Sequence, residues 1–169
     1  MARDLGYDGL SFLTGDIQSY VSGEPIDMVV TLHACDVATD AAIVQAIGWD
    51  CRILLTVPCC QHELNSQIAT ENFGVLTRYG IVKERVAALM TDAIRANLLQ
   101  CCGYKTQLLE FVSLDHTPKN LLIRAVRGGG NPDGRPLREV HSLMEEFHVR
   151  PTLYRLMEEA GMLPRESGS

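Results

Sequence analysis

The hydrophobic positions of this chain fall into short runs, and each run stops at polar or turn-forming residues. Three runs near the N-terminus have the length of strands, namely residues 10–13, Met28–Leu32 and Ile53–Val57. The β-branched content of the second favours a buried strand. We expect the second and third runs to be parallel neighbours, with their C-terminal ends at one edge of a sheet.

Reactive side chains directly follow both of these strands. Met28–Leu32 runs into His33-Ala34-Cys35-Asp36, and Ile53–Val57 runs into Pro58-Cys59-Cys60-Gln61-His62. Open α/β sheets bind ligands in the crevice beyond the carboxyl ends of their strands. The crevice between the two segments is therefore the predicted functional site.

Helical spacing of apolar residues predicts four helices. The first has Asp36 or Thr39 as its N-cap and ends at Gly48, and the second runs from Ile81 towards a stop at Gly103. Residues 128–134 read as a flexible turn or linker. Two amphipathic helices follow, with apolar faces in 137–147 and 153–160.

Two further strands are predicted at residues 108–114 and 121–126. The six residues that join them are too few for a parallel crossover connection. This pair of strands must therefore be antiparallel.

Composition indicates one soluble domain. The chain has 169 residues, of which 46% are hydrophobic and 21% charged. The polar start Met1-Ala2-Arg3-Asp4 and the absence of a long apolar stretch give no sign of export or membrane insertion, so a cytoplasmic location is the default expectation. Four of the six cysteines are direct sequence neighbours, as Cys59-Cys60 and Cys101-Cys102. A disulfide between neighbours forces awkward backbone geometry, so reduced thiols are favoured over a disulfide framework.

The net charge of −6 offers no general attraction for a phosphate backbone. The later part of the chain is locally basic, although nearby acidic residues dilute the patch and favour a solvated mixed-charge surface. The basic residues concerned are Lys119, Arg124, Arg127, Arg135 and Arg138.

Several motifs in order along residues 5–127 resemble one family. They include Leu32-His33-Ala34-Cys35-Asp36, Val57-Pro58-Cys59-Cys60, Thr91-Asp92-Ala93-Ile94-Arg95-Ala96 and His116-Thr117-Pro118-Lys119-Asn120. Together they are similar to the S-adenosylmethionine-dependent methyltransferase-like family that carries the strand motifs HACD and PCC. The resemblance implies an α/β fold with a Rossmann-like sheet and S-adenosylmethionine as cofactor.

The resemblance also implies that part of the family's fold is missing. Such domains begin with a strand, a glycine-rich loop, a helix and a second strand ending in an acidic residue, and none of these is found here. We therefore expect an incomplete Rossmann-like methyltransferase sheet, mostly parallel with a terminal antiparallel strand pair, lacking the first two strands and the glycine-rich loop. Residues 1–127 would be the C-terminal portion of the methyltransferase-like domain, and 128–169 a linker and helices packed on the same unit.

An exposed strand edge follows from this topology. The family's sheet order is three, two, one, four, five, seven, six, which places the missing strands between residues 10–13 and Met28–Leu32. An apolar edge with unpaired backbone groups tends to recruit another strand. We expect either that residues 10–13 pair out of place or that two copies associate through this edge as a homo-oligomer.

The resemblance implies roles for particular residues at the crevice. The residues expected to contact the cofactor are Gly15, Asp16, Ile17 and His33. The Asp16 carboxylate would accept a hydrogen bond from the adenine amino group. Asp36 is the preferred catalytic carboxylate, and His33 faces the sulfonium and the acceptor atom. Residues bordering the acceptor are Cys59, Cys60, His62, His116 and Lys119.

Several candidate residues also have a purely structural interpretation. Gly15-Asp16 can be a polar turn that caps a helix, and Asp36 can be the N-cap of the helix that follows it. Free cysteines are among the most buried residues, so packing is the simpler interpretation for Cys51, Cys101 and Cys102. Lone histidines such as His141 and His148 read as surface or boundary residues.

Two other functions remain open. A zinc ion could be held by His33, Cys35, Cys59, Cys60 and His62, although adjacent cysteines in an extended segment point apart and no C-x-x-C knuckle is present. The second alternative is a non-catalytic fragment or scaffold that keeps the fold without binding cofactor. The main expectation is a methyltransferase acting on an RNA or protein nitrogen, with the isolated chain unable to hold the cofactor.

Overall fold

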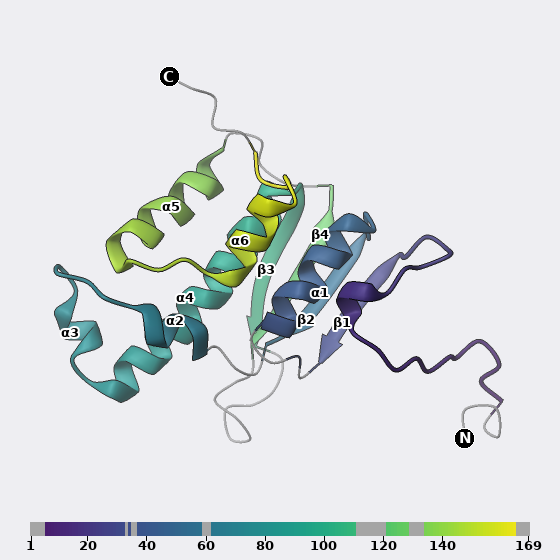
Figure 1. Cartoon of the computed structure of the whole chain (residues 1–169), viewed down its shortest axis with the longest axis horizontal. Helices are drawn as coiled ribbons and strands as arrows, with labels where there is room; N and C mark the ends of the chain where they lie inside the picture. Colours follow the sequence, from purple (N-terminus) through teal and green to yellow (C-terminus); the bar gives the residue numbers. More distant parts are fainter. Residues whose placement is uncertain are drawn as a thin grey trace.

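The computed structural model of the chain describes residues 6–32, 34, 37–58, 62–110, 121–128 and 134–164. Figure 1 shows a sheet with helices over it and an N-terminal segment that runs away from it. The sheet fixes where each predicted site segment begins. Its topology is therefore the first constraint on the site.

Four strands form one mixed sheet in the order β1-β2-β4-β3. They are β1 (Met28–Leu32), β2 (Ile53–Val57), β3 (Tyr104–Glu110) and β4 (Leu121–Arg127). β1 and β2 are parallel, whereas β4 is antiparallel to both β2 and β3. The predicted antiparallel pair is confirmed, and β4 lies between β2 and β3 as the order five, seven, six implies. β3 begins at Tyr104, four residues before the strand predicted at 108–114. Because residues 10–13 form no strand, the described sheet is mixed, with one parallel and two antiparallel ladders.

The strand predicted at residues 10–13 is not formed. This segment lies before a short 3₁₀ helix, η2 (Ile17–Ser19), and its side chains are exposed, with Leu10 at 52%, Phe12 at 81% and Leu13 at 74%. A short apolar run becomes a strand only where another strand satisfies its backbone groups. The expectation that it pairs out of place within the chain is therefore also wrong.

The predicted helices are confirmed. They are α1 (Val37–Gly48), α4 (Gly80–Cys101), α5 (Arg135–Phe147) and α6 (Thr152–Glu159). Two short helices, α2 (His62–Gln67) and α3 (Gly74–Thr77), were not predicted, because neither is long enough to show a helical period. Among the described residues, no helix is both long and apolar enough to cross a membrane.

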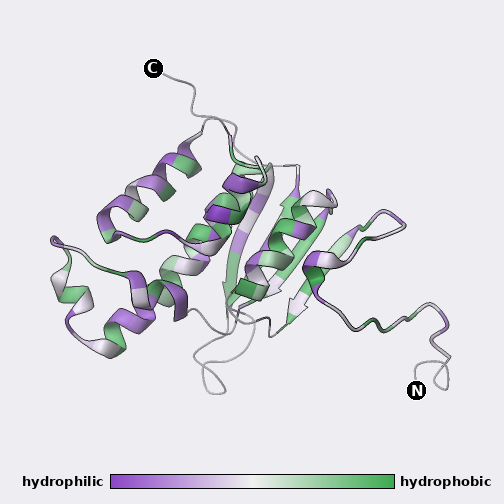
Figure 2. Cartoon of the chain, in the orientation of Figure 1, coloured by the Kyte–Doolittle hydropathy of each residue, from purple (hydrophilic) through white to green (hydrophobic). Residues whose placement is uncertain are grey.

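The hydrophobic core lies between one face of the sheet and the helices. Alternating strand residues point into it, and Val29, Leu54, Ile123 and Ala125 are at most 8% exposed. Figure 2 shows hydrophobic residues along β2 and β4, the two central strands. The helices α1 and α4 contact these strands, and α6 and α5 pack in turn on α1 and α4.

The start of α6 is fastened to α2. The Glu63 carboxylate accepts hydrogen bonds from the backbone N–H of Thr152, at 3.1 Å, and from its hydroxyl, at 2.7 Å. The side-chain carbonyl of Gln67 accepts from the backbone N–H of Arg150 at 2.7 Å. Unpaired N–H groups at a helix start need such acceptors, and here a distant helix supplies them. The helix α2, which follows β2 in the chain, is therefore held by the start of α6.

We expect Leu54→Ala to lower the free energy of unfolding by about 2–5 kcal/mol, because Leu54 is fully buried between sheet and helices. The matched change Leu89→Ala, at a residue of α4 that is 59% exposed, should stay within about 0.5 kcal/mol of the parent. Urea denaturation followed by circular dichroism measures both. Equal losses for the two variants would contradict this placement of the core.

Candidate functional site

Strands β1 and β2 end side by side. Their register pairs Leu32 with Val57, the last residue of each strand. One residue earlier, the Thr31 hydroxyl donates to the Thr56 hydroxyl at 2.6 Å, a bond that fixes this register. The prediction that these strands are parallel neighbours is confirmed, so the two reactive segments start from the same edge of the sheet.

We call this edge the rim, defined by Leu32, Ala34, Val57, Pro58 and His62. Six of the predicted site residues lie outside the described residues, and their roles stay predictions. They are His33, Asp36, Cys59, Cys60, His116 and Lys119.

Asp16 caps η2. Its side chain accepts a hydrogen bond from the backbone N–H of Gln18 at 2.9 Å, which confirms the structural interpretation of Gly15-Asp16 as a capping turn. Gln45 of α1 donates to the Gln18 carbonyl at 2.8 Å and so holds η2 beside that helix. Gly15 and Asp16 are exposed and Ile17 is half-buried. Their predicted cofactor contacts remain a prediction.

His62 is the first residue of α2, and its side chain is exposed. It stands four residues after Pro58, which is buried at the end of β2. The next residue, Glu63, binds the start of α6. His62 is thus carried by a helix that is anchored directly behind it.

The turn from β1 into α1 is fixed by a buried threonine. The Thr39 hydroxyl donates to the Ala34 carbonyl at 2.5 Å, and Thr39 is fully buried. This bond spans the sequence that contains Cys35 and Asp36. Asp36 immediately precedes Val37, where α1 begins, so its predicted N-cap role is compatible with the helix boundary.

A buried ion-pair network lies in the core just beyond this turn. The Arg95 guanidinium of α4 donates through Nε to the Asp40 carboxylate of α1 at 2.7 Å, and through Nη1 to Asp92 at 3.1 Å. All three residues are at most 2% exposed. Asp92 and Arg95 belong to the Thr91–Ala96 motif, but neither they nor Asp40 were predicted to have a role. The i,i+3 spacing of Asp92 and Arg95 was the available signal.

Burial alone would lower the pKa of the Arg95 guanidinium, but the Asp40 and Asp92 carboxylates outweigh that cost and raise its pKa. Arg95 therefore stays charged. A buried charge without a partner is strongly unfavourable, so the network ties the first turn of α1 to α4.

Three cysteines are described, and all are free thiols. Cys51 is fully buried, while Cys101 and Cys102 are half-buried. Burial raises the pKa of the Cys51 thiol and raises the pKa of Cys101 and Cys102 to about 11. A thiol reacts as its thiolate, so a raised pKa makes these residues less reactive. Cys51 belongs to the hydrophobic core, and Cys101 and Cys102 pack against it, in agreement with the structural interpretation.

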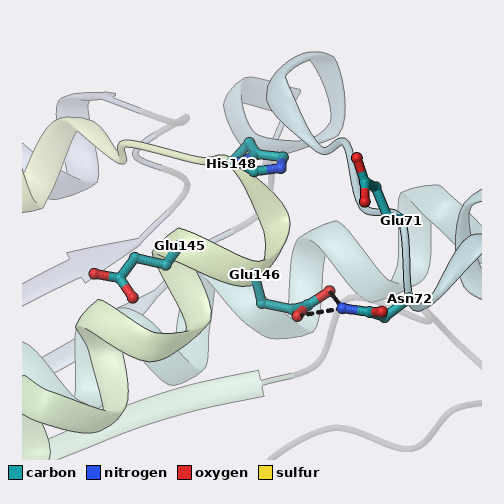
Figure 3. A pocket seen from close by; sticks show the side chains of 5 residues that line it. All are labelled: Glu71, Asn72, Glu145, Glu146 and His148. Atoms are coloured by element: carbon teal, nitrogen blue, oxygen red, sulfur yellow. Dashed lines mark hydrogen bonds between the residues drawn. The ribbon is translucent and has the colours of Figure 1, made fainter.

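A separate polar pocket of about 230 Å³ lies between the end of α5 and the segment before α3. Figure 3 shows Glu146 and Asn72 pointing toward one another across it, with Glu71, Glu145 and His148 around them. Hydrogen bonds from Thr70 and Asn72 lower the pKa of Glu146. These bonds connect the segment to α5, and the pocket is not part of the rim.

No cluster of three or more potential metal ligands occurs among the residues that the structure describes. Four of the five predicted zinc ligands, His33, Cys35, Cys59 and Cys60, fall outside that set. His62 alone is described, and the zinc alternative stays untested.

Residues 1–67 match the model of a family described as a methyltransferase domain. The matched residues include η2, β1, α1, β2 and α2, and so both strands that form the rim. For these residues, the match confirms the resemblance to a methyltransferase family. Neither the curated proteins nor the solved structures gave a match.

Replacing Arg95 should be costly, because two buried carboxylates would lose their cation. We expect Arg95→Met to lower the free energy of unfolding by about 3–5 kcal/mol. The matched control is Arg150→Met, since Arg150 pairs with Glu158 at the surface and its loss should cost about 0–1 kcal/mol. Chemical denaturation measures the free energy of unfolding of both variants. Similar losses of stability in the two would show that the Arg95 network does not stabilise the core.

Native thiol labelling should be slow at Cys101 and Cys102. At pH 8 a pKa of about 11 leaves about 0.1% thiolate, against roughly a quarter for an unperturbed thiol. We expect iodoacetamide to modify both residues far faster in urea than in buffer, as measured by peptide mass spectrometry. Labelling at equal rates in the two solvents would show that neither thiol is protected.

Proposed function

We propose that this chain forms the acceptor side of a class I S-adenosylmethionine-dependent methyltransferase, with a nitrogen of RNA or protein as acceptor. The observation that carries the proposal is the rim. Within residues matched to a methyltransferase family, two parallel strands end in register at one edge, and the HACD and PCC segments follow these strands in the sequence.

The strand order supports the same assignment. The described sheet runs β1-β2-β4-β3. In the order three, two, one, four, five, seven, six that the resemblance implies, this corresponds to strands four, five, seven and six. β4, which is antiparallel to both of its neighbours, takes the place of strand seven in that order.

The roles follow from position around the rim. S-adenosylmethionine, when bound, supplies an activated methyl group on its sulfonium. His33 and Asp36 follow β1 and would face the transferred methyl, while Cys59, Cys60 and His62 follow β2 and would border the acceptor. His116 and Lys119 would complete the acceptor side, and Asp16 would bind the adenine amino group. Methyl transfer depends chiefly on in-line positioning, and Asp36 acts as a base where the acceptor carries a proton.

The described residues fit only one side of the cofactor. Asp16 is an available carboxylate beside α1, although its side chain already caps η2. A glycine-rich turn after the family's first strand normally lets backbone approach the cofactor, and the described strands correspond to four, five, seven and six of the family order, so none of them supplies that turn. We therefore infer that this chain alone binds the cofactor weakly at most. The scaffold alternative, in which the chain keeps the fold and binds no cofactor, stays open.

The net charge of −6 makes RNA the less favourable of the two methyl acceptors for this chain alone. Affinity for RNA depends on cations that replace counterions along the phosphate backbone. An RNA acceptor would require additional basic surface beyond the exposed Arg124 and Arg127 of β4.

The test is a two-dimensional NMR titration with S-adenosylhomocysteine up to millimolar concentration. We expect weak, fast-exchanging shifts centred on the amides of Leu32, Ala34, Val57 and His62, because the rim contacts the reacting end of the cofactor. His33→Ala should remove these shifts. The matched change His141→Ala, at a residue that bonds Tyr154 on the C-terminal helices, should retain them.

Two results would contradict separate parts of the proposal. Saturable micromolar binding would show that the chain holds the cofactor by itself. Shifts that lie away from the rim would contradict the proposed site. The absence of any shift at millimolar concentration would favour the scaffold alternative over cofactor binding by this chain.

A further inference from the structure

An exposed apolar surface lies on α3 and the first turns of α4. Its members are large hydrophobic side chains that are at least 43% exposed, namely Phe73, Val75, Tyr79, Ile81 and Leu89. Apolar side chains scattered singly over a surface are ordinary, but this many within residues 73–89 mark a contact surface. We call these five residues the α3–α4 face.

The strand order that the resemblance implies does not account for this exposure. That order places further strands beside β1, whereas Figure 1 shows α3 on the side of the molecule away from β1. Along α4, the exposed residues Ile81, Arg85 and Leu89 follow one another at four-residue intervals and so share one side of the helix. The α3–α4 face is therefore a surface of the folded helices themselves.

Contacts with α5 hold the α3 end of this face in place. Phe73 stacks on Phe147 with the ring centroids 5.6 Å apart. The Glu146 carboxylate accepts hydrogen bonds from the Thr70 hydroxyl at 2.7 Å and from the Asn72 side chain at 3.0 Å. A surface that is already ordered loses little conformational entropy when a partner binds, so these contacts favour docking.

Cations lie among the apolar residues at the α4 end of the face. Arg78 and Arg85 are exposed and Lys83 is half-buried, and Glu84 is the one acidic residue in residues 78–85. Arg78, Lys83 and Arg85 form no ion pair with the residues that the structure describes. Acidic groups of a partner would be attracted to these cations, and basic groups repelled.

The start of α4 lies at the same end of the sheet as the rim. β3 is parallel to β2, because β4 is antiparallel to both. The chain leaves the carboxyl end of β2, and α4 then returns it to the beginning of β3. A helix in such a crossover begins towards the carboxyl ends of the parallel strands, where the rim is found.

We propose that the α3–α4 face is the docking surface for a protein acceptor, which binds through a segment that carries apolar and acidic residues on one side. The proposal rests on the proposed methyltransferase function and selects protein over RNA as the acceptor. Val75, Ile81 and Leu89 are aliphatic, and they are buried best by apolar side chains of a protein. Nucleic-acid bases stack on aromatic rings, and the net charge of −6 disfavours a phosphate backbone.

Charge also sets the direction of the docked segment. At the Phe73 end of the face, Glu71 and Glu146 line the polar pocket. At the other end, the cations Arg78 and Arg85 are exposed. The acidic residues of the partner therefore lie against the start of α4, away from the pocket.

Two synthetic peptides test this docking chemistry. Both are amphipathic helices with leucine at positions i, i+3, i+4 and i+7, and they differ in having either glutamate or lysine at the flanking positions. Each is titrated to millimolar concentration into isotope-labelled protein and followed by two-dimensional NMR. The glutamate peptide should shift the amides of residues 73–89 saturably and bind about tenfold more tightly than the lysine peptide, because it meets three cations.

Variants assign the binding to the face. Val75→Ser/Ile81→Ser should weaken the glutamate peptide about tenfold or more, since two apolar contacts are lost. Arg78→Gln/Arg85→Gln should remove most of the preference for glutamate over lysine. The matched control Leu13→Ser/Val21→Ser changes side chains that are 74% and 85% exposed elsewhere and should leave the affinity unchanged. Circular dichroism confirms that each variant is folded.

Several results would overturn the proposal. They are the absence of saturable binding, glutamate-peptide shifts centred on β1, and equal or tighter binding of the lysine peptide. Shifts at residues 73–89 with single-stranded oligouridine that Arg78→Gln/Arg85→Gln abolishes would also overturn it, because the partner would then be RNA. The rim amides report S-adenosylhomocysteine separately, so a failure of docking is distinguishable from a failure of cofactor binding.

Discussion

The parallel, in-register pairing of β1 with β2 is the constraint on which the site depends. It brings the last residues of both strands to one edge, and the hydrogen bond between Thr31 and Thr56 holds that register. A shift of one residue would move every side chain of β1 to the opposite face of the sheet. Val29 would then leave the core, so burial and site geometry select the same register.

Each rim segment is also fixed from behind. After β1, the buried Thr39 binds the Ala34 carbonyl, and Asp40 joins Arg95 in the core. After β2, α2 is held because Glu63 binds the start of α6. The strand before each segment and the helix after it are therefore both held in place. Positioned loops on a rigid scaffold are the usual way in which an α/β fold presents reactive side chains.

Local pattern was sufficient for part of this structure. Apolar runs predicted β1 and β2, and helical periodicity predicted α1 and α4, because each of these elements buries a regular set of side chains. Pattern failed at residues 10–13, since a strand also needs a partner that a local sequence does not reveal. The Glu63 to Thr152 and Asp40 to Arg95 contacts were missed because each joins residues more than fifty positions apart.

The central claim is that the HACD and PCC segments share one crevice. The most direct measurement is the distance between the Cα atoms of His33 and Cys59 in a crystal structure. Neighbouring strands are about 4.8 Å apart and each further residue adds at most about 3.4 Å, so the account predicts a separation below about 15 Å with both residues at the rim. A structure that places them on opposite sides of the molecule would contradict it.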